Sequence, residues 1–293
     1  MMHLRAPLPQ EWTVENLSPF DELILSWNGQ RPREGAFLFS ISVKIDDWSP
    51  WLPYASWGSE GQSSFQSKAE AITIDYDTLS ILEKKATGFR IKISTQGTAS
   101  LTELSSLHVY IHREKSSDLT PTESIALPVP GLSQMCLNHL RYRDLCSPTS
   151  TTAVIHYLLK KKSLLPLHFA EQVWDQGGDL FGNWVFNIAQ ASACLGSEWS
   201  CWVEKLSGFG DIYKKLHQGI PIITSVRGPL PGSAAPYATG HLLVVTGYDP
   251  LKERVLCMDP AFPSDDATHI SYSLSDFMEA WERRGKVAYI FTM

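Results

Sequence analysis

Alternating polar and apolar positions mark the first third of the chain as a set of short strands. A period of two residues is typical of a strand with one buried face, and turn-forming pairs such as Asn28-Gly29 separate the alternating runs. The predicted strands cover residues 22–27, 36–45, 88–94 and 107–112. Several short strands divided by turns predict a β-sandwich-like domain over residues 1–113.

A change of composition follows these strands. Residues 114–130 are rich in Ser, Thr and Pro and include Pro121, Pro128 and Pro130. This composition is typical of a linker between domains. We therefore predict a linker over residues 114–130 and a second domain over residues 131–293.

The hydrophobic pattern of residues 131–293 predicts helices first and strands afterwards. The predicted helices cover a segment that opens at Cys146, residues 183–191 and residues 211–217, with a later helix that Ser273 caps and that runs through Trp281. The predicted strands cover residues 221–226, 241–248, 254–258 and 287–291. Helices followed by an antiparallel sheet give an α+β fold class for this domain.

Composition and charge exclude several classes of protein. The 293 residues are 43% hydrophobic and 19% charged, as in ordinary globular proteins. The net charge is -6 and no basic run is longer than residues 160–162, so nucleic-acid or anionic-membrane binding has no electrostatic support. No apolar stretch has the length of a membrane span, and the first residues lack the apolar core of a secretory signal. We expect a cytoplasmic protein, with export by another route left open.

The five cysteines are odd in number and well dispersed, which argues against a disulfide framework. No CxxC pair is present, and the sequence predicts neither a metal nor a cofactor. Cys194, Cys201 and Cys257 are interpreted as packing residues, and Cys136 receives no role. Cys146 differs from these four because it stands where a loop becomes a helix.

Cys146 has the position of a nucleophile. Pro148 suits the first turn of a helix, and the basic residues 160–162 suit its end. A thiol at a helix N-terminus feels the positive end of the helix dipole, which favours the thiolate form. A thiolate attacks carbonyl carbon, so we looked for the other groups that such chemistry requires.

Candidates for these groups follow the order Gln134, Cys146, His241, Asp259. His241 begins a strongly apolar strand and is the candidate base; a strand-end histidine with a structural hydrogen bond is the alternative. Asp259 follows the strand of residues 254–258 and would orient His241 if the two strands are neighbours; a turn-forming Asp before Pro260 is the alternative. Gln134 is the candidate oxyanion donor, with Asn138 as a rival and a surface loop residue as the alternative.

This order resembles that of papain-like cysteine peptidases, and more closely the C39-like branch of bacteria. The matching segments are residues 129–135, 145–151, 182–187, 240–248 and 259–261, with residues 20–28 and 48–53 similar to the β-rich region that precedes the peptidase domain. The resemblance implies a papain-like fold, a peptide or protein substrate, and Cys146 as nucleophile, His241 as general base and acid, Asp259 as orienting group and Gln134 in the oxyanion hole. Ser147 departs from the pattern, since many relatives have Gly there.

Two other functions stay open at this point. The same groups would serve an amidase or acyltransferase acting on a non-peptide substrate, and a catalytically inactive domain would make the chain a binding protein. The tryptophans of the first third fit core packing better than a site for a partner or polysaccharide. The Gly- and Pro-rich residues 228–236 precede His241, and we expect them to border the cleft as a lid or specificity wall.

Overall fold

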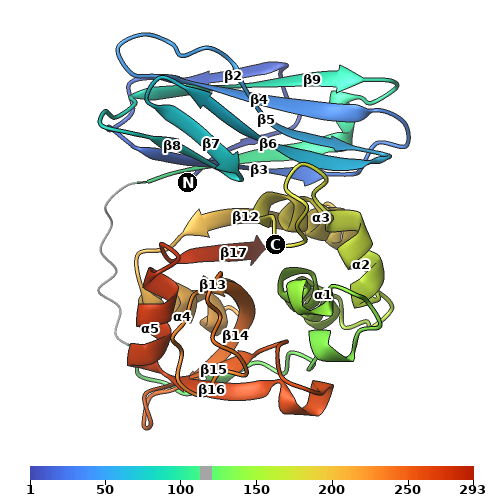
Figure 1. The fold of residues 1–293 in the computed structure, drawn as a ribbon, viewed down its shortest axis with the longest axis vertical. Helices are drawn as coiled ribbons and strands as arrows, with labels where there is room; N and C mark the ends of the chain where they lie inside the picture. Colours follow the sequence, from blue (N-terminus) through green and yellow to red (C-terminus); the bar gives the residue numbers. More distant parts are fainter. Residues whose placement is uncertain (113–120) are drawn as a thin grey trace. The chain divides into compact units, whose positions relative to one another are not determined.

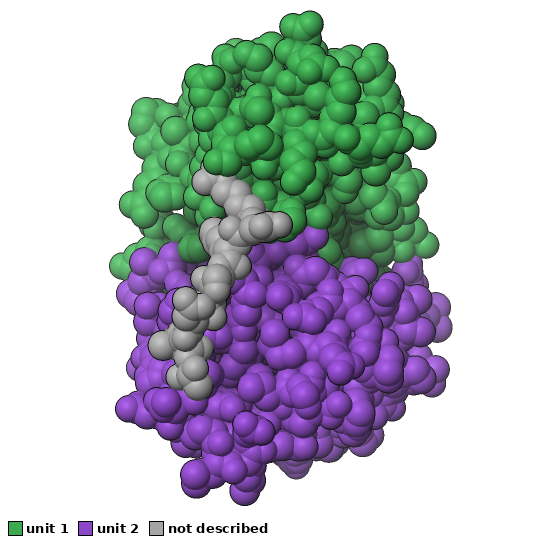
Figure 2. Space-filling view, turned by 90° about the vertical axis from the view of Figure 1, so that its left-hand side faces the viewer, with its two compact units in different colours: residues 1–113, 173–203 green, residues 114–172, 204–293 purple. Residues whose placement is uncertain are grey.

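Residues 1–112 and 121–293 are described by a computed structural model (Figure 1). The chain divides into two compact units: unit 1 contains residues 1–113 and 173–203, and unit 2 contains residues 114–172 and 204–293 (Figure 2). The start of the predicted linker lies outside the described residues. Compact units need not coincide with domains, so the limits 1–113, 114–130 and 131–293 remain a prediction.

Ten antiparallel strands form the sheet of unit 1, in the spatial order β1-β10-β3-β8-β7-β6-β5-β4-β9-β2. They are β1 (Met2–Arg5), β2 (Glu11–Val14), β3 (Glu22–Gly29), β4 (Ala36–Lys44), β5 (Leu52–Gly58), β6 (Gly61–Ala69), β7 (Ile72–Tyr76), β8 (Thr78–Ile81), β9 (Gly88–Gln96) and β10 (Leu104–Ile111), with a 3-10 turn at η1 (Leu101–Glu103). All four strands predicted above are present.

Strand β6 lets this sheet curl over itself. Its first half pairs with β5 and its second half with β7. Strands β3 and β4 are not neighbours in the sheet, yet Trp27 of β3 stacks on Phe39 of β4 with ring centroids 4.2 Å apart. Trp57 of β5 joins the same fully buried cluster. Two layers therefore enclose an aromatic core, which confirms the predicted sandwich.

The segment of residues 173–203 belongs to unit 1 through buried polar contacts. Asp175 is fully buried and accepts hydrogen bonds from the Ser64 backbone and from Asn183 Nδ2, both at 2.9 Å. Asn28 donates to the Cys201 carbonyl and accepts from the Cys201 N–H. Helix α3 (Trp184–Leu195), which Asn183 caps, packs on β3. These contacts span up to 173 residues of sequence.

The sheet of unit 2 has the order β17-β13-β14-β15-β16, and β11 also pairs with β14. The strands are β11 (Ile125–Ala126), β13 (Ile222–Val226), β14 (His241–Asp249), β15 (Arg254–Met258), β16 (His269–Ser273) and β17 (Val287–Thr292), while β12 (Ser200–Lys205) crosses the boundary between the units. Strand β11 lies within the predicted linker. Gly247 permits this pairing, because a Cβ there would lie 2.1 Å from the Ile125 carbonyl oxygen.

Helices pack on this sheet as the α+β prediction requires. They are α1 (Cys146–Leu159), α4 (Phe209–His217) and α5 (Leu274–Glu282); α2 (Pro166–Val173) precedes the segment of unit 1, and short 3-10 turns form η2 (Gln134–Cys136), η3 (Tyr142–Asp144) and η4 (Asp265–Ala267). In Figure 1, α1 stands to the right of the strands, and α4 and α5 to their left. Ser273 caps α5 as predicted, accepting from the Asp276 N–H. The α+β class is confirmed.

Candidate active site

Cys146 is the first residue of α1, and the helix that follows it is buried. Residues 147–156 all lie in the core, whereas Cys146 itself is only partly buried. The first N–H groups of a helix have no acceptor within that helix. The thiol and these N–H groups therefore occur together at the partly buried N-terminus of α1.

A hydrogen bond ties α1 to the strand that carries His241. Ser150 Oγ donates to the carbonyl oxygen of Leu242 at 3.1 Å, and both residues are buried. His241 is the first residue of β14, directly after Gly240, whose φ of 122° lies in the region that favours glycine. The predicted nucleophile and base thus lie at the starts of α1 and β14, and the Ser150–Leu242 hydrogen bond joins these two elements about one helical turn after Cys146.

Asp259 comes beside His241 because β15 pairs with β14. The register places Met258 opposite Val244, and Asp259 follows at the end of β15. His241 Nε2 lies 2.7 Å from Asp259 Oδ1, and the two side chains are 5% and 0% exposed. The Cys146 thiol lies near enough to the His241 ring to contribute to the raised pKa of the imidazole. Since Nε2 is used by Asp259, Nδ1 is the ring nitrogen that remains for proton exchange with a thiol.

Opposing effects set the charge of this pair. Burial disfavours the charged imidazole, but the charge and hydrogen bond of Asp259, with a contribution from Cys146, outweigh it and raise the pKa of His241 to about 10. Burial likewise acts to raise the pKa of Asp259, and the attraction of His241 and the hydrogen bonds it accepts hold that pKa below its usual value. A protonated imidazole beside an ionised carboxylate is the stable state at neutral pH.

Three further groups hold the Asp259 carboxylate. Oδ2 accepts from the hydroxyls of Tyr237 at 2.8 Å and Tyr272 at 2.6 Å, and Oδ1 accepts from the Ala261 N–H at 3.0 Å. Every direction around this buried charge is therefore occupied by a donor, as a buried carboxylate requires. Neither tyrosine was predicted from the sequence; the position of Tyr237 four residues before His241 is a weak local signal.

Gln134 is buried close to the start of α1, so it is not a surface loop residue. It opens the η2 turn and is 3% exposed, while its rival Asn138 is exposed. Gln134 Nε2 donates to the Arg143 carbonyl at 2.8 Å, three residues before Cys146. Its Oε1 has no hydrogen-bond partner in the part of the chain that the structure describes. The second hydrogen of Nε2 remains chemically free to serve as a donor.

Ser147 does not need to crowd the thiol, because its side chain is directed into the core. It is fully buried, and its Oγ lies 2.9 Å from the hydroxyl of Tyr289 in β17. The hydroxyl contact gives Ser147 a packing role.

The remaining cysteines are all free thiols. Cys201 and Cys257 are buried, and burial raises the pKa of both thiols. Cys194 is partly buried with a pKa raised by the same cause, and Cys136 is exposed. Cys146 is the cysteine that contributes to the pKa of a histidine paired with a carboxylate, and such an arrangement suits thiol-mediated acyl transfer.

Across residues 1–112 and 121–293, no group of three His, Cys, Asp or Glu side chains is arranged to hold a metal ion. Within those ranges, no helix combines the length and apolar character needed to cross a membrane.

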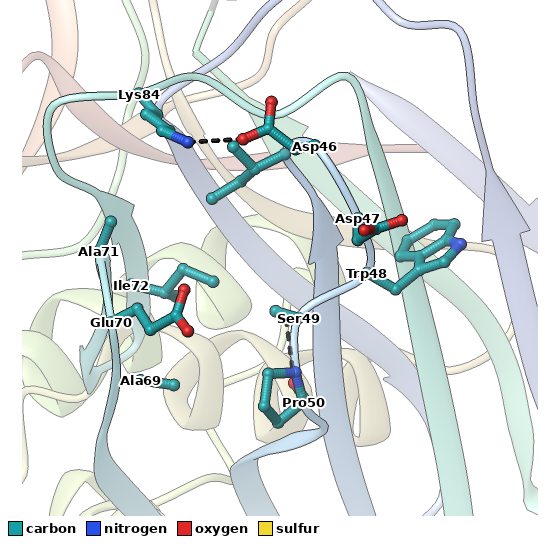
Figure 3. Close-up of a pocket in the computed structure, with 11 residues that line it drawn as sticks. Asp46, Asp47, Trp48, Ser49, Pro50, Ala69, Glu70, Ala71, Ile72 and Lys84 are labelled. Atoms are coloured by element: carbon teal, nitrogen blue, oxygen red, sulfur yellow. Dashed lines mark hydrogen bonds and ion pairs between the residues drawn. The ribbon is translucent and has the colours of Figure 1, made fainter.

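A surface pocket of unit 1 lies between residues 45–50 and 69–72, beside the Lys84–Asp46 ion pair (Figure 3). The Trp48 ring points away from this pocket in Figure 3. Arg90 lies over the rings of both Trp48 and Trp51, at 4.8 Å and 4.5 Å from their centroids. These two tryptophans therefore make cation–π contacts within the unit.

Comparison with known proteins gives one family. The model described as "Peptidase_C39 like family" matches residues 126–289, more than half of the chain and a range that holds all four candidate residues. A search of the curated proteins found no match. Among solved structures, the chain is similar to a protein from Bacillus anthracis named as a candidate C39-like peptidase, with 18% identity, a TM-score of 0.46, and coverage of 59% of this chain and 98% of that one.

Proposed function

The chain belongs to the Peptidase_C39 like family, and we propose that it is a cysteine hydrolase that cleaves a peptide or isopeptide bond. Cys146 is the nucleophile, His241 the general base and acid, and Asp259 the orienting group. The observation that carries this proposal is the buried hydrogen bond between His241 and Asp259, with the Cys146 thiol near enough to the imidazole to contribute to its raised pKa. Thiol hydrolysis requires a nucleophile, a base that exchanges its proton, and a group that orients the base.

In the first step, Cys146 reacts as the thiolate of an ion pair with the imidazolium of His241, and its sulfur attacks the carbonyl carbon of the substrate. Asp259 stabilises this imidazolium, because its carboxylate is held ionised by His241, two tyrosine hydroxyls and a backbone N–H. The carbonyl oxygen becomes an oxyanion. The Cys146 N–H at the start of α1 and the Nε2 group of Gln134 are the donors that would stabilise it.

The second step releases the amine. His241 gives its proton to the leaving nitrogen, and the carbon–nitrogen bond breaks to leave a thioester on Cys146. Water then attacks the thioester with His241 as base, and the acid product leaves with regeneration of the thiol. The buried Asp259 keeps the imidazole in one orientation through both half-reactions.

Residues 228–236 are proposed to form a wall of the substrate cleft. They are mostly exposed and uncharged, and the following residue, Tyr237, contacts His241. Shortening this segment between Pro231 and Ala235 should raise KM. The free energy of unfolding should change little. A loss of folding with no change in KM would contradict this role.

Digestion of a peptide library in ¹⁸O-labelled water tests the proposed reaction. Wild type and the matched control Cys136→Ala, which changes an exposed thiol, should yield new carboxyl ends that carry ¹⁸O. Cys146→Ala and His241→Ala should yield none. Equal cleavage by Cys146→Ala would overturn the proposal, and hydrolysis of small amides or thioesters without peptide cleavage would move the substrate class to non-peptide acyl compounds.

A further inference from the structure

Tyr237 touches both members of the His241–Asp259 pair. Its ring stacks on the imidazole with centroids 3.9 Å apart and planes 15° from parallel. Its hydroxyl donates to Asp259 Oδ2 at 2.8 Å. One side chain therefore covers a face of the proposed base and fixes the carboxylate that orients it.

The backbone at Tyr237 is held in an unfavourable conformation. Its φ of 50° is in the left-handed region, which a bulky aromatic residue rarely adopts. The Tyr237 carbonyl accepts hydrogen bonds from the N–H groups of Gly228 and Gly240, both at 3.2 Å. Residues with such strain persist where the surrounding structure fixes them, and they concentrate at functional sites.

Tyr237 is also the point where the loop between β13 and β14 is attached to the site. Residues 228–240 carry no charged side chain, and most of them are exposed. The large side chains that the loop buries are Leu230 and Tyr237, which are 3% and 7% exposed. Of these two, Tyr237 is the one whose ring stacks on His241.

We propose that Tyr237 is a positioning residue that aligns His241 and Asp259 with Cys146 and makes the reactivity of Cys146 depend on the conformation of the loop of residues 228–240. The importance of this alignment for catalysis rests on the proposed function. The contacts of Tyr237 with the pair do not rest on it.

The ring and the hydroxyl make separable contributions. The ring keeps water from one face of the imidazole, and hydrogen bonds between charged groups are stronger where water is excluded. Burial, followed by the charge of Asp259, raises the pKa of Tyr237 above its ordinary value, so its hydroxyl stays a donor. Tyr272 donates to the same Oδ2 atom from β16, a strand fixed by pairing with β15. Tyr272→Phe is therefore a matched control, because it removes one hydroxyl from Asp259 Oδ2 and leaves the Tyr237 ring in place.

The titration of His241 reports this alignment directly. The charged or titratable groups near its ring are Asp259, the Cys146 thiol and Tyr237, with Tyr272 acting through Asp259 and Arg284 beside Gly240. Removing the Tyr237 ring admits water, which weakens the attraction of Asp259 for the imidazolium. The pKa of His241 should then fall from about 10 toward its ordinary value of 6.5.

The experiment compares wild type with Tyr237→Leu, Tyr237→Phe and Tyr272→Phe. Imidazole ¹⁵N NMR measures the His241 titration, and mass spectrometry follows iodoacetamide alkylation at Cys146, with Cys136 as internal reference. In Tyr237→Leu we expect the His241 midpoint to fall by at least about one pH unit and Cys146 alkylation at pH 7 to slow at least about tenfold. In Tyr237→Phe we expect a several-fold slower alkylation than in Tyr272→Phe, because only Tyr237 uses its hydroxyl to attach a loop.

The possible failures are distinguishable. A wild-type His241 titration and alkylation rate in Tyr237→Leu would overturn the positioning role. If Tyr237→Leu does not fold, equal alkylation rates in Tyr237→Phe and Tyr272→Phe would overturn it. Alkylation of wild-type Cys146 no faster than Cys136 would instead count against the proposed function, while a lowered His241 midpoint in Tyr237→Leu would still support the positioning role.

Discussion

The imidazole of His241 and the carboxylate of Asp259 form a hydrogen-bonded pair, 2.7 Å apart, that is almost completely excluded from water. A carboxylate in this position fixes the orientation of the imidazole and stabilises its charged form. The bond exists because β14 and β15 are neighbours, which places the first residue of one strand beside the residue that follows the other. Its removal should therefore impair the base.

Asp259→Asn should lower kcat/KM by about 10²- to 10⁴-fold, because an amide neither carries the charge nor fixes the same imidazole tautomer. Asp249→Asn is the matched control: Asp249 ends β14 and caps a turn by accepting from the Leu251 and Lys252 N–H groups. Steady-state kinetics of both variants on one substrate would check this. Similar losses in the two variants would argue against an orienting role for Asp259.

The free energy of unfolding should depend on pH through His241. Its pKa is raised to about 10 in the folded chain from 6.5 in the unfolded chain, so its stabilisation is complete below pH 6.5 and is lost as pH rises through 10. Between these values, wild type should lose up to about 1.4 kcal/mol per pH unit more than His241→Gln. Urea unfolding of both proteins from pH 6 to 10 measures the difference. If the free energies of unfolding of the two proteins changed equally with pH, His241 would have the same pKa in the folded and the unfolded chain.

Ser150 should matter for activity because its hydroxyl joins α1 to β14 at Leu242. Ser150→Ala should cost about 1 kcal/mol of stability and lower kcat/KM roughly tenfold, since small displacements of reacting groups are costly. Thr151→Ala removes a bond within α1, from Thr151 Oγ1 to the Ser147 carbonyl, and touches no strand through it. Unfolding and kinetic measurements on both should show similar losses of stability but a loss of activity confined to Ser150→Ala.

Much of the fold could be predicted from sequence because its signals are local. The alternation of residues 36–45 marks β4, and the apolar run after His241 marks β14. Strands of weaker alternation, such as β6 with its Ser- and Gln-rich sequence, carry no such signal. The grouping of residues 173–203 with unit 1 depends on long-range hydrogen bonds such as that from Asn28 to the Cys201 carbonyl, and no local sequence pattern predicts such a bond.

The candidate site likewise contains residues that the sequence predicts and residues that it does not. Cys146, His241 and Asp259 stand at the ends of elements that the sequence predicts, so the contact between His241 and Asp259 could be predicted. Tyr237 acts through a left-handed backbone conformation that a sequence pattern does not reveal. Tyr272 reaches Asp259 only because β16 pairs with β15, a strand pair that was not predicted.

Asp175 should be essential for the stability of unit 1. Its buried carboxylate accepts from the Ser64 N–H and hydroxyl, from the N–H groups of residues 177 and 178, and from Asn183. Asp175→Ala leaves these donors unpaired and should cost about 3 kcal/mol or more in urea unfolding. Asp75→Ala, at an exposed carboxylate of the same unit, should cost less than about 1 kcal/mol. Equal losses would mean that the buried network contributes little.

The most direct test of Cys146 as an activated nucleophile is its rate of alkylation by iodoacetamide at pH 6, measured against Cys136 in the same molecule. In wild type, Cys146 should react at least about tenfold faster than the exposed Cys136, because His241 accepts its proton. In His241→Ala, the Cys146 rate should fall to that of Cys136 or below. Equal rates for Cys146 in wild type and in His241→Ala would contradict the assignment of His241 as its base.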